Sequence, residues 1–365
     1  EGPAVPSDLP VPGSRCVYYR FGAFRAPHKT GKTSPGWIFD PRGKRIQDYR
    51  ARKHAVPKWI QDPFLSERTA RLSRFSVKSS PLLLRYRAFK ALSQRGKGGV
   101  YVCLDLGITR CSLRVLKEGR RFGEQDWEGL DGYMRVKNES KMLKLLRAKG
   151  LSVPSLIDEF DTDNCTYCVQ DYLYGLSLQR IAPTFRRLKQ RTEVLLPVIR
   201  KMVEELEKLH ALQVAWRDLK PANIFATIDR RIVFLDLEGA CTNAKACTDA
   251  WGSQGYVPPE WLAPRDLATI QKQDIYAFGV TCIQLLLGRK VPVNNLRLLD
   301  SLVSWLPWSI ICNLQSCLST DPSLRPTSTQ LRLTFTSLVS EEIGESFWRQ
   351  VTNLFRTTPI LGQLT

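Results

Sequence analysis

The order of strands and helices along the chain limits its fold more than any other feature of the sequence. From about residue 80, short runs of β-branched, aromatic and apolar residues predict strands. These runs are Leu82–Phe89, Gly99–Leu106, Cys111–Leu116 and Thr166–Asp171. Apolar residues at helical spacing predict a helix at Gly132–Leu146 and, after the fourth run, a series of helices that includes Glu193–Leu209. Strands with one helix, followed by a helical remainder, predict a segregated α+β fold in two lobes.

The first of these helices should have one apolar side. That side would consist of Met134, Met142, Leu145 and Leu146.

The positive charge of the chain is concentrated near its N-terminal end. The formal net charge is +19, and residues 1–95 contribute +14 of it, with 20 Lys and Arg against 6 Asp and Glu. Such an excess attracts nucleic acid, a membrane surface or an acidic peptide, and charge alone does not rank these partners. A solvated surface explains the charge equally well. Nucleic acid is a less expected partner than a peptide, although the charge is compatible with it.

Residues 1–80 differ in composition from the rest, with many Pro, Gly, Arg and aromatic residues. Several large apolar side chains favour burial, so we expect this segment to pack on its neighbour. They are Trp37, Phe39, Trp59, Ile60 and Phe64. The chain begins with Glu1 and not Met, which indicates a piece of a longer protein.

Cysteine spacing and hydropathy bear on the cellular compartment. The ten cysteines follow neither a disulfide framework nor a paired zinc pattern, so we expect free thiols. The nearest metal motif, Cys165-Thr-Tyr-Cys168, lies in an expected strand, where residues three apart face opposite sides. No apolar stretch reaches the roughly 18–20 residues that cross a bilayer, and no signal peptide is visible. We therefore expect a cytoplasmic chain with no membrane span.

One eight-residue stretch carries a strong chemical signal. Trp216-Arg-Asp-Leu-Lys-Pro-Ala-Asn223 resembles the catalytic loop H-R-D-L-x-x-x-N of protein kinases, with Trp in place of His. The resemblance makes Asp218 the acceptor of the substrate hydroxyl proton and Asn223 a metal ligand. Lys220 resembles a catalytic residue of the Ser/Thr class, and Ser253 supports the same class.

A second carboxylate follows at the spacing typical of kinases. Asp236-Leu-Glu238 comes after the apolar run Ile232–Leu235 and stands where kinases carry D-F-G. Asp236 would hold the Mg²⁺ that bridges the nucleotide phosphates. Glu238 replaces a glycine, and we expect this to stiffen the turn, because glycine tolerates unusual backbone angles.

Three later residues resemble structural positions of the family. Gly252–Glu260 looks like the end of an activation segment, with Glu260 as the acid of A-P-E. Asp274 and Arg325 resemble the buried pair of residues that ties the large lobe together. We expect all three to act in structure and not in chemistry.

The nucleotide site is expected in the strand region. Val115-Leu-Lys117 resembles V-A-I-K, which makes Lys117 the ligand of the α- and β-phosphates and Glu139 its partner. The glycine-rich loop is the weakest match. When Val100 is aligned with the valine of G-x-G-x-x-G-x-V, Ser93 and Arg95 occupy the first two glycine positions and Gly98 alone is retained. The end of the fourth strand adds two further nucleotide-binding candidates, Gln170 and Tyr172.

Each of these residues has an ordinary explanation when taken alone. Asp218 could cap a helix, Lys117 could be a solvated strand residue and Asp236 could sit in a turn. Their common order and spacing favour a two-lobed kinase-like fold, with a small β-rich lobe and a helical lobe. A small-molecule phosphotransferase is the alternative enzyme, but we would not expect it to carry Gly252–Glu260 or Arg325. A catalytically dead scaffold is disfavoured, because neither Trp216 nor Glu238 replaces a catalytic group.

The whole chain, and not only its kinase part, resembles the class III lanthionine synthetases, which join a lyase region, a kinase domain and a cyclase domain. The resemblance is carried by Tyr19–Gly22, Asp40–Gly43, Asp48–Arg50, Pro57–Phe64, Gly98–Tyr101, Val115–Arg120, Asp131–Glu139 and Asp236–Glu238. It implies a kinase that uses ATP or GTP with Mg²⁺ to phosphorylate Ser and Thr of a precursor peptide, whose phosphate is then eliminated. An acidic or amphipathic leader on that peptide would dock on the basic residues.

This resemblance suggests four segments. Residues 1–80 would be the end of a lyase region, 81–172 the small kinase lobe, 173–340 the large lobe and 341–365 a C-terminal tail. About 80 residues are too few for a full lyase domain, and no Cys/His cluster of a zinc cyclase follows the kinase part. We therefore expect an excised fragment or a stand-alone relative.

Overall fold

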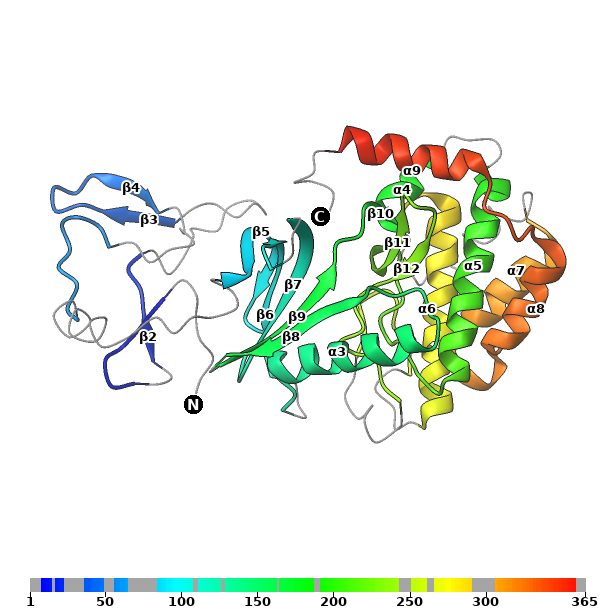
Figure 1. Cartoon of the computed structure of the whole chain (residues 1–365), viewed down its shortest axis with the longest axis horizontal. Coiled ribbons are helices and arrows are strands. Elements are labelled where there is room, and N and C mark those ends of the chain that lie inside the picture. The colour runs from blue at the N-terminus through cyan, green and yellow to red at the C-terminus, as the bar shows by residue number, and fades with distance from the viewer. Residues whose placement is uncertain are drawn as a thin grey trace.

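The two-lobed α+β fold is confirmed (Figure 1). The computed structural model of the chain describes residues 8–14, 17–22, 36–48, 56–64, 84–107, 111–125, 129–162, 164–186, 191–242, 251–260, 266–290 and 306–358. A five-stranded sheet with one helix forms the small lobe, and a helical lobe with a small three-stranded sheet follows it. The chain crosses from one lobe to the other after residue 171, where the last strand of the large sheet ends.

The small lobe is an antiparallel sheet with the strand order β5-β6-β7-β9-β8. Its strands are β5 (Tyr86–Arg95), β6 (Gly98–Asp105), β7 (Ser112–Arg120), β8 (Leu156–Asp161) and β9 (Cys165–Asp171). The first strand starts later and runs further than the apolar pattern predicts, because its pairing with β6 continues through the polar end Ser93 to Arg95. Strand β8 has no counterpart among the predicted strands.

Helix α3 (Gly132–Ala148) packs on β7 and β9 and begins at a clear N-cap. The Asp131 carboxylate accepts a hydrogen bond from the backbone N–H of Met134 at 2.9 Å, which satisfies a donor that the first turn leaves free. Met142 and Leu146 are buried as expected, but Met134 is half exposed. The buried side of the helix therefore runs through Val136 and not through Met134, and Glu139 is buried within it.

The large lobe is built around two long helices, α5 (Arg191–Ala211) and α6 (Leu267–Leu287) (Figure 1). Helix α6 is buried along almost its whole length, which explains its lack of a polar face. The remaining helices are α4 (Leu178–Phe185), α7 (Trp308–Cys317), α8 (Ser328–Leu338) and α9 (Glu345–Thr357). Short 3-10 turns η1 (Pro221–Asn223) and η5 (Pro322–Leu324) connect these elements, and strands β10 (Gly175–Ser177), β11 (Ile224–Thr227) and β12 (Ile232–Phe234) form the small sheet.

Helix α9 lies in the segment expected as a tail. Phe347, Trp348 and Val351 are buried in the main hydrophobic core of the large lobe. The Phe347 ring stacks on Phe185 of α4 with centroids 5.7 Å apart. Residues 345–357 are thus part of the packed lobe.

The N-terminal residues form two hairpins, which Figure 1 shows on the far side of the five-stranded sheet from the helical lobe. They pair β1 (Leu9–Pro10) with β2 (Tyr18–Tyr19), and β3 (Gly36–Phe39) with β4 (Arg45–Asp48). The hydroxyl of Tyr19 donates to Asp62 at 2.9 Å, and its ring meets Phe64 at 4.9 Å. The predicted burial of Phe39, Trp59 and Ile60 is wrong, since all three are exposed; the side chain of Trp37 lies outside the described residues.

The prediction of free thiols is correct for most of the described cysteines and wrong for Cys241. Cys165 and Cys168 of β9 are free and buried, and five other described cysteines elsewhere in the chain are also free. Cys241 takes part in a disulfide, which irregular spacing could not reveal. In the described part of the chain, no helix is long and apolar enough to cross a bilayer.

Candidate functional site

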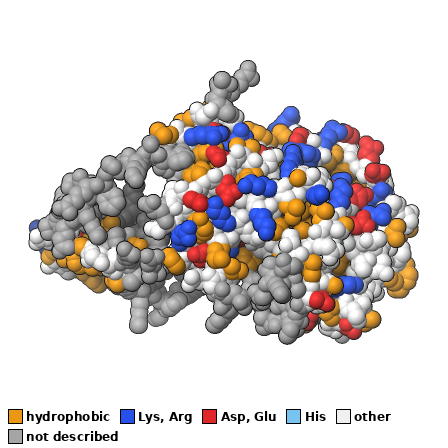
Figure 2. Space-filling model, turned by 60° about the horizontal axis from the view of Figure 1, so that its bottom comes forward, with side chains coloured by type: hydrophobic (Ala, Val, Ile, Leu, Met, Phe, Trp, Pro, Cys, Tyr) orange, Lys and Arg blue, Asp and Glu red, His pale blue; other side chains and the backbone are white. Residues whose placement is uncertain are grey.

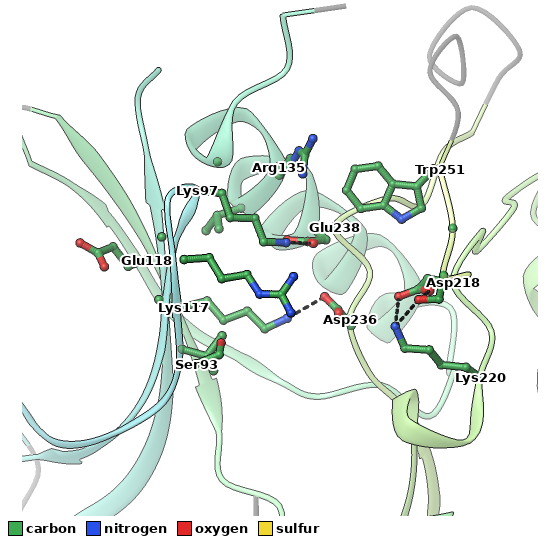
Figure 3. Close-up of a pocket in the computed structure, with 18 residues that line it drawn as sticks. Ser93, Lys97, Lys117, Glu118, Arg135, Asp218, Lys220, Asp236, Glu238 and Trp251 are labelled. Atoms are coloured by element: carbon green, nitrogen blue, oxygen red, sulfur yellow. Dashed lines mark hydrogen bonds and ion pairs between the residues drawn. The ribbon is translucent and has the colours of Figure 1, made fainter. Parts of the chain in front are cut away.

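An ion-pair cluster joins the two lobes at the cleft between them (Figure 3). Lys117 of β7 donates to both carboxylate oxygens of Glu139 of α3 at 2.7 Å. The same ammonium group donates to Asp236, which follows β12 in the large lobe, at 3.1 Å. The pairing of Lys117 with Glu139 that the motif order suggests is therefore present, and Asp236 joins it.

For Lys117 and Asp236, the charges of their neighbours outweigh the cost of burial. Burial disfavours the charged form of Lys117, but the carboxylates of Asp236 and Glu139 raise its pKa above the usual range. Burial likewise opposes the ionised form of Asp236, but Lys117 and Lys97 lower the pKa of its carboxyl. The lysine is therefore a fixed cation and Asp236 a fixed anion, and about a third of the Asp236 side chain is open to the cleft.

Gln170 extends this cluster toward the link between the lobes. Its side-chain amide donates to Glu139 at 3.0 Å, and the side chain is buried. Burial raises the pKa of the Glu139 carboxyl, while Lys117 opposes that shift. Gln170 thus orients the partner of Lys117 as well as lining the adjacent cavity.

The catalytic-loop residues surround Asp218. Lys220 donates to one of its carboxylate oxygens at 2.7 Å, and the Ser253 hydroxyl donates to the other at 2.7 Å. Lys220 also donates to the oxygen of Ser253 at 2.7 Å, which closes a three-membered network. The amide of Asn223 donates to the backbone carbonyl and the carboxylate of Asp218, both at 2.9 Å. One loop and one activation-segment serine therefore fix the Asp218 carboxylate.

Trp216 takes over the supporting role of the histidine that it replaces. Its ring stacks on Phe234 with centroids 4.4 Å apart, and its indole N–H donates to the backbone carbonyl of Asp236 at 3.2 Å. The indole thus supports the loop both by ring packing and by a hydrogen bond.

The backbone at this point adopts an unusual conformation. Arg217 and Asp236 have φ of 71° and 61°, in the left-handed region that non-glycine residues avoid. Glu238 is not among the described residues with positive φ, so its replacement of glycine does not stiffen the turn as expected. The strained backbone lies at Arg217 and Asp236, the residues beside and within the catalytic motifs, as is common at functional sites.

Two further motif residues are buried in the large lobe and away from the cleft. Asp274 of α6 accepts from the backbone N–H groups of Trp216 at 2.7 Å and Arg217 at 2.6 Å, so it holds the start of the catalytic loop. Arg325 makes a bidentate ion pair with Glu260 at 2.6 and 2.9 Å. The structure therefore shows these contacts, and the structural roles of Asp274, Glu260 and Arg325 stay predictions.

Two adjoining cavities open between the lobes. A polar cavity of about 470 Å³ contains Lys117, Asp218, Lys220 and Asp236 in its lining. A more apolar cavity of about 410 Å³ shares Lys117 and Asp236 and also reaches Asn223. Its apolar lining includes Leu92, Val100, Val115, Leu173, Phe225 and Leu235. An apolar cavity beside a charged one suits a nucleotide, whose flat base is followed by its phosphates.

Four of the six predicted nucleotide residues line these cavities, whereas Glu139 and Tyr172 line neither of them. Gly98 and Val100 line the polar cavity, and a side chain at Gly98 would lie 1.8 Å from the carbonyl oxygen of Glu118, so only glycine fits there. Ser93 and Arg95, aligned with the first two glycines, also line it. Tyr172 does not line the described cavities, and its ring packs against Tyr174 at 5.0 Å.

Sequence reasoning missed several lining residues. Leu173 and Phe225 lie in the apolar cavity, where a family alignment of the strand ends could have found them. Sequence reasoning also missed Asn138 of α3, which lies outside the lining of both cavities and donates from its amide to the backbone carbonyls of Glu238 at 3.1 Å and Ala240 at 2.8 Å. An ion pair between Lys97 and Glu238 spans the cleft and has no signal in the motifs.

This fold and site define a protein kinase-like phosphotransferase. The protein kinase domain family matches residues 94–334, more than half of the chain, and the chain belongs to this family. The RamC N-terminal domain family matches residues 1–74.

Curated relatives agree with both matches. Probable SapB synthase of Streptomyces coelicolor is 27% identical over 315 residues, which are 82% of this chain and 32% of that protein. Serine/threonine-protein kinase B of Synechocystis sp. is 29% identical over 225 residues, which are 56% of this chain and 37% of that protein. This chain thus spans less than half the length of these relatives, and the expected resemblance to class III lanthionine synthetases is confirmed.

A protein kinase domain uses ATP and a divalent metal ion. The residues present suit both. The amide N–H group of Asn223 is engaged by Asp218, which leaves its carbonyl oxygen for a metal, and Asp236 offers an ionised, partly open carboxylate. Oxygen ligands of this kind are those that Mg²⁺ prefers.

Proposed function

We propose that this chain phosphorylates Ser and Thr of a precursor peptide as the first step of lanthipeptide-type dehydration. The observation that carries the proposal is that similarity to SapB synthase runs through 82% of the chain and includes the RamC-type N-terminal part, whereas similarity to the Synechocystis kinase covers only 56%. General Ser/Thr kinases account for the kinase part alone.

The proposed reaction follows from the residues around Asp218. The oxygen of the acceptor hydroxyl forms a bond to the γ-phosphorus, the bond from that phosphorus to the β,γ-bridging oxygen breaks, and the hydroxyl proton passes to Asp218. Lys220, 2.7 Å from Asp218, neutralises charge that develops on the transferred group.

The nucleotide would be held mainly by the small lobe. Lys117, fixed by Glu139, binds the α- and β-phosphates, and the apolar cavity with Val100 takes the base. Asn223 and Asp236 would hold Mg²⁺, which supplies charge neutralisation at the β- and γ-phosphates. Elimination of the new phosphate by a lyase activity would then give the dehydroamino acid. The cytoplasm, which supplies nucleotide and Mg²⁺, is the proposed location.

The test is transfer to a defined peptide. The chain is incubated with ATP or GTP, Mg²⁺ and a leader-bearing lanthipeptide precursor rich in Ser and Thr, and phosphopeptides are identified by mass spectrometry. We expect phosphate on several Ser and Thr with wild type and none with Asp218→Asn. Transfer to generic protein substrates, with none to any precursor peptide, would favour a general Ser/Thr kinase instead.

A leader tether is the second part of this proposal. Residues 1–95 carry most of the net charge. Figure 2 shows further Lys and Arg side chains, with Asp and Glu among them, across the middle of one described face. An acidic leader bound to residues 1–95 would keep successive acceptors near Asp218. Phosphorylation of the leader-bearing peptide should exceed that of the leaderless core at low salt, and this advantage should fade toward roughly 0.5–1 M salt, where screening is short-ranged. An advantage that persists unchanged in salt would contradict an electrostatic tether.

A further inference from the structure

Lys97 occupies a position from which a side chain can reach across the cleft. It lies in the two-residue turn between β5 and β6, since Arg95 and Gly98 are the last paired residues of that hairpin. Its ammonium group forms an ion pair with the carboxylate of Glu238, which stands two residues after Asp236. Figure 3 shows this pair lying beside the contact between Lys117 and Asp236.

The turn that carries Lys97 is fixed to the small lobe. The carbonyl of Lys97 accepts from the backbone N–H of Arg120 at 2.9 Å, and the N–H of Gly96 donates to Glu124 at 3.0 Å. Gly132 approaches so closely that a side chain there would lie 1.8 Å from the Lys97 carbonyl oxygen. The backbone of Lys97 is therefore anchored at the cleft. Its flexible side chain can pair with different nearby anions.

Glu238 is fixed from the other side. Its backbone carbonyl accepts from the amide of Asn138 of α3, so the segment after Asp236 is tied to the helix that carries Glu139. The Glu238 side chain is 14% exposed and that of Lys97 is 27% exposed. Both line the polar cavity with Lys117, Asp218 and Lys220.

The chemistry of this cavity indicates what replaces the pair. A nucleotide triphosphate brings several anionic oxygens into a cavity where Lys117 is already engaged by two carboxylates. Lys97 also lines this cavity, and its partner is Glu238. Glu238 has no role in the transfer reaction proposed above. A phosphate chain carries more charge than one carboxylate, so it competes well for a partly exposed ammonium group.

We propose that Lys97 is a further nucleotide-binding residue that contacts the phosphates, and that Glu238 is the counter-ion that holds it in the cleft until nucleotide binds. This inference rests on the proposed kinase function and adds a second phosphate-binding lysine to Lys117. It also assigns a function to Glu238, the glutamate that replaces the glycine of D-F-G. If a phosphate replaces Glu238 as the partner of Lys97, the affinity of the chain for a nucleotide should depend on how many phosphates that nucleotide carries.

The test is calorimetric titration of the full chain with Mg·ATP and Mg·ADP. Lys97→Met should weaken ATP binding about tenfold, as expected for loss of a charge-assisted contact, and should weaken ADP binding less. Lys97→Arg should retain most of the affinity. Glu238→Gln should tighten ATP binding about threefold, because the competing partner is gone, and the double variant should behave like Lys97→Met. Lys141→Met, on the exposed side of α3, is the control and should bind like wild type.

Each result decides the matter. Wild-type ATP affinity in Lys97→Met, or tighter binding in that variant, would overturn the phosphate role and leave a simple latch between the lobes. Weaker binding in Glu238→Gln would overturn its role as counter-ion. These results would leave the proposed kinase function standing, whereas absence of nucleotide binding by wild type would overturn both. Thermal unfolding of each variant shows whether any loss reflects misfolding.

Discussion

Asp236 in the cleft and Asp274 in the large lobe are carboxylates with opposite surroundings. Asp274 is fully buried, and its oxygens accept from the backbone N–H groups of Trp216 and Arg217 and contact a ring nitrogen of His210 at 3.2 Å. Asp236 faces one lysine at 3.1 Å and keeps about a third of its side chain open. The first carboxylate is satisfied by the protein, and the second has capacity left for a ligand.

The surroundings of Arg325 and Lys117 show the same contrast. Arg325 donates to Glu260, to the carbonyl of Ser319 at 2.9 Å and to the carbonyl of Lys272 at 3.1 Å, with no exposed side-chain surface. Lys117 contacts carboxylates alone, at the edge of two cavities. A buried charge whose hydrogen bonds and ion pairs are all made within the protein stabilises one structure. A charge in a cavity that keeps some of this capacity can bind a ligand.

The largest expected effect is the loss of phosphoryl transfer on substitution of Asp236 in the cleft. Asp236→Asn removes the proposed metal ligand, so phosphoryl transfer should fall by about 10²–10³-fold or more, in line with losses of charge-stabilising groups. Thermal shift with ATP, with and without Mg²⁺, should show that wild type needs the metal for full stabilisation and that the variant does not respond to it. A variant that keeps wild-type transfer would remove Asp236 from the site.

The next effect concerns stability and not chemistry. Arg325→Met leaves Glu260 partly buried without its partner, which should lower the free energy of unfolding by about 3–5 kcal/mol. Arg230→Met is a matched control, because its ion pair with Glu345 is exposed and should contribute less than about 1 kcal/mol. Denaturant unfolding measures both changes. Equal losses in the two variants would contradict the contrast between buried and exposed pairs.

The smallest effect tests the link between the two regions. Trp216→Phe keeps the stack on Phe234 but loses the hydrogen bond to the carbonyl of Asp236, so we expect a loss of about 1–3 kcal/mol in stability and a several-fold lower rate of transfer. Trp216→His restores a donor and should recover part of the rate. If Phe and His variants have the same transfer rate, the hydrogen bond does not position Asp236.

The sequence predicts the site better than it predicts the details of the fold. Lys117, Glu139, Asp218, Asn223 and Asp236 could be found because phosphoryl transfer demands those residue types in a fixed order. Their contacts depend on backbone geometry that the family shares, so order alone is informative.

Other features depend on contacts that local patterns do not contain. Strand β8 was missed because its sequence holds three acidic residues, and Lys137 and Lys144 of α3 balance Glu159 at 2.7 and 3.0 Å. The contact between Lys97 and Glu238 joins residues 141 positions apart, and it exists only because the lobes meet. Long-range side-chain pairs of this kind require the folded structure.

The most direct test of the contrast between cleft and core compares Asp218→Asn with Asp274→Asn. For each variant, the rate of γ-phosphate transfer to a Ser/Thr peptide and the unfolding midpoint are measured at a temperature where both remain folded. The account predicts that Asp218→Asn loses transfer by about 10²–10⁴-fold and keeps a near wild-type midpoint, because Asp218 is the proposed acceptor of the hydroxyl proton. It predicts that Asp274→Asn unfolds at a clearly lower temperature but transfers phosphate when folded. The reverse pattern, with transfer retained in Asp218→Asn and lost in a stable Asp274→Asn, would contradict the account.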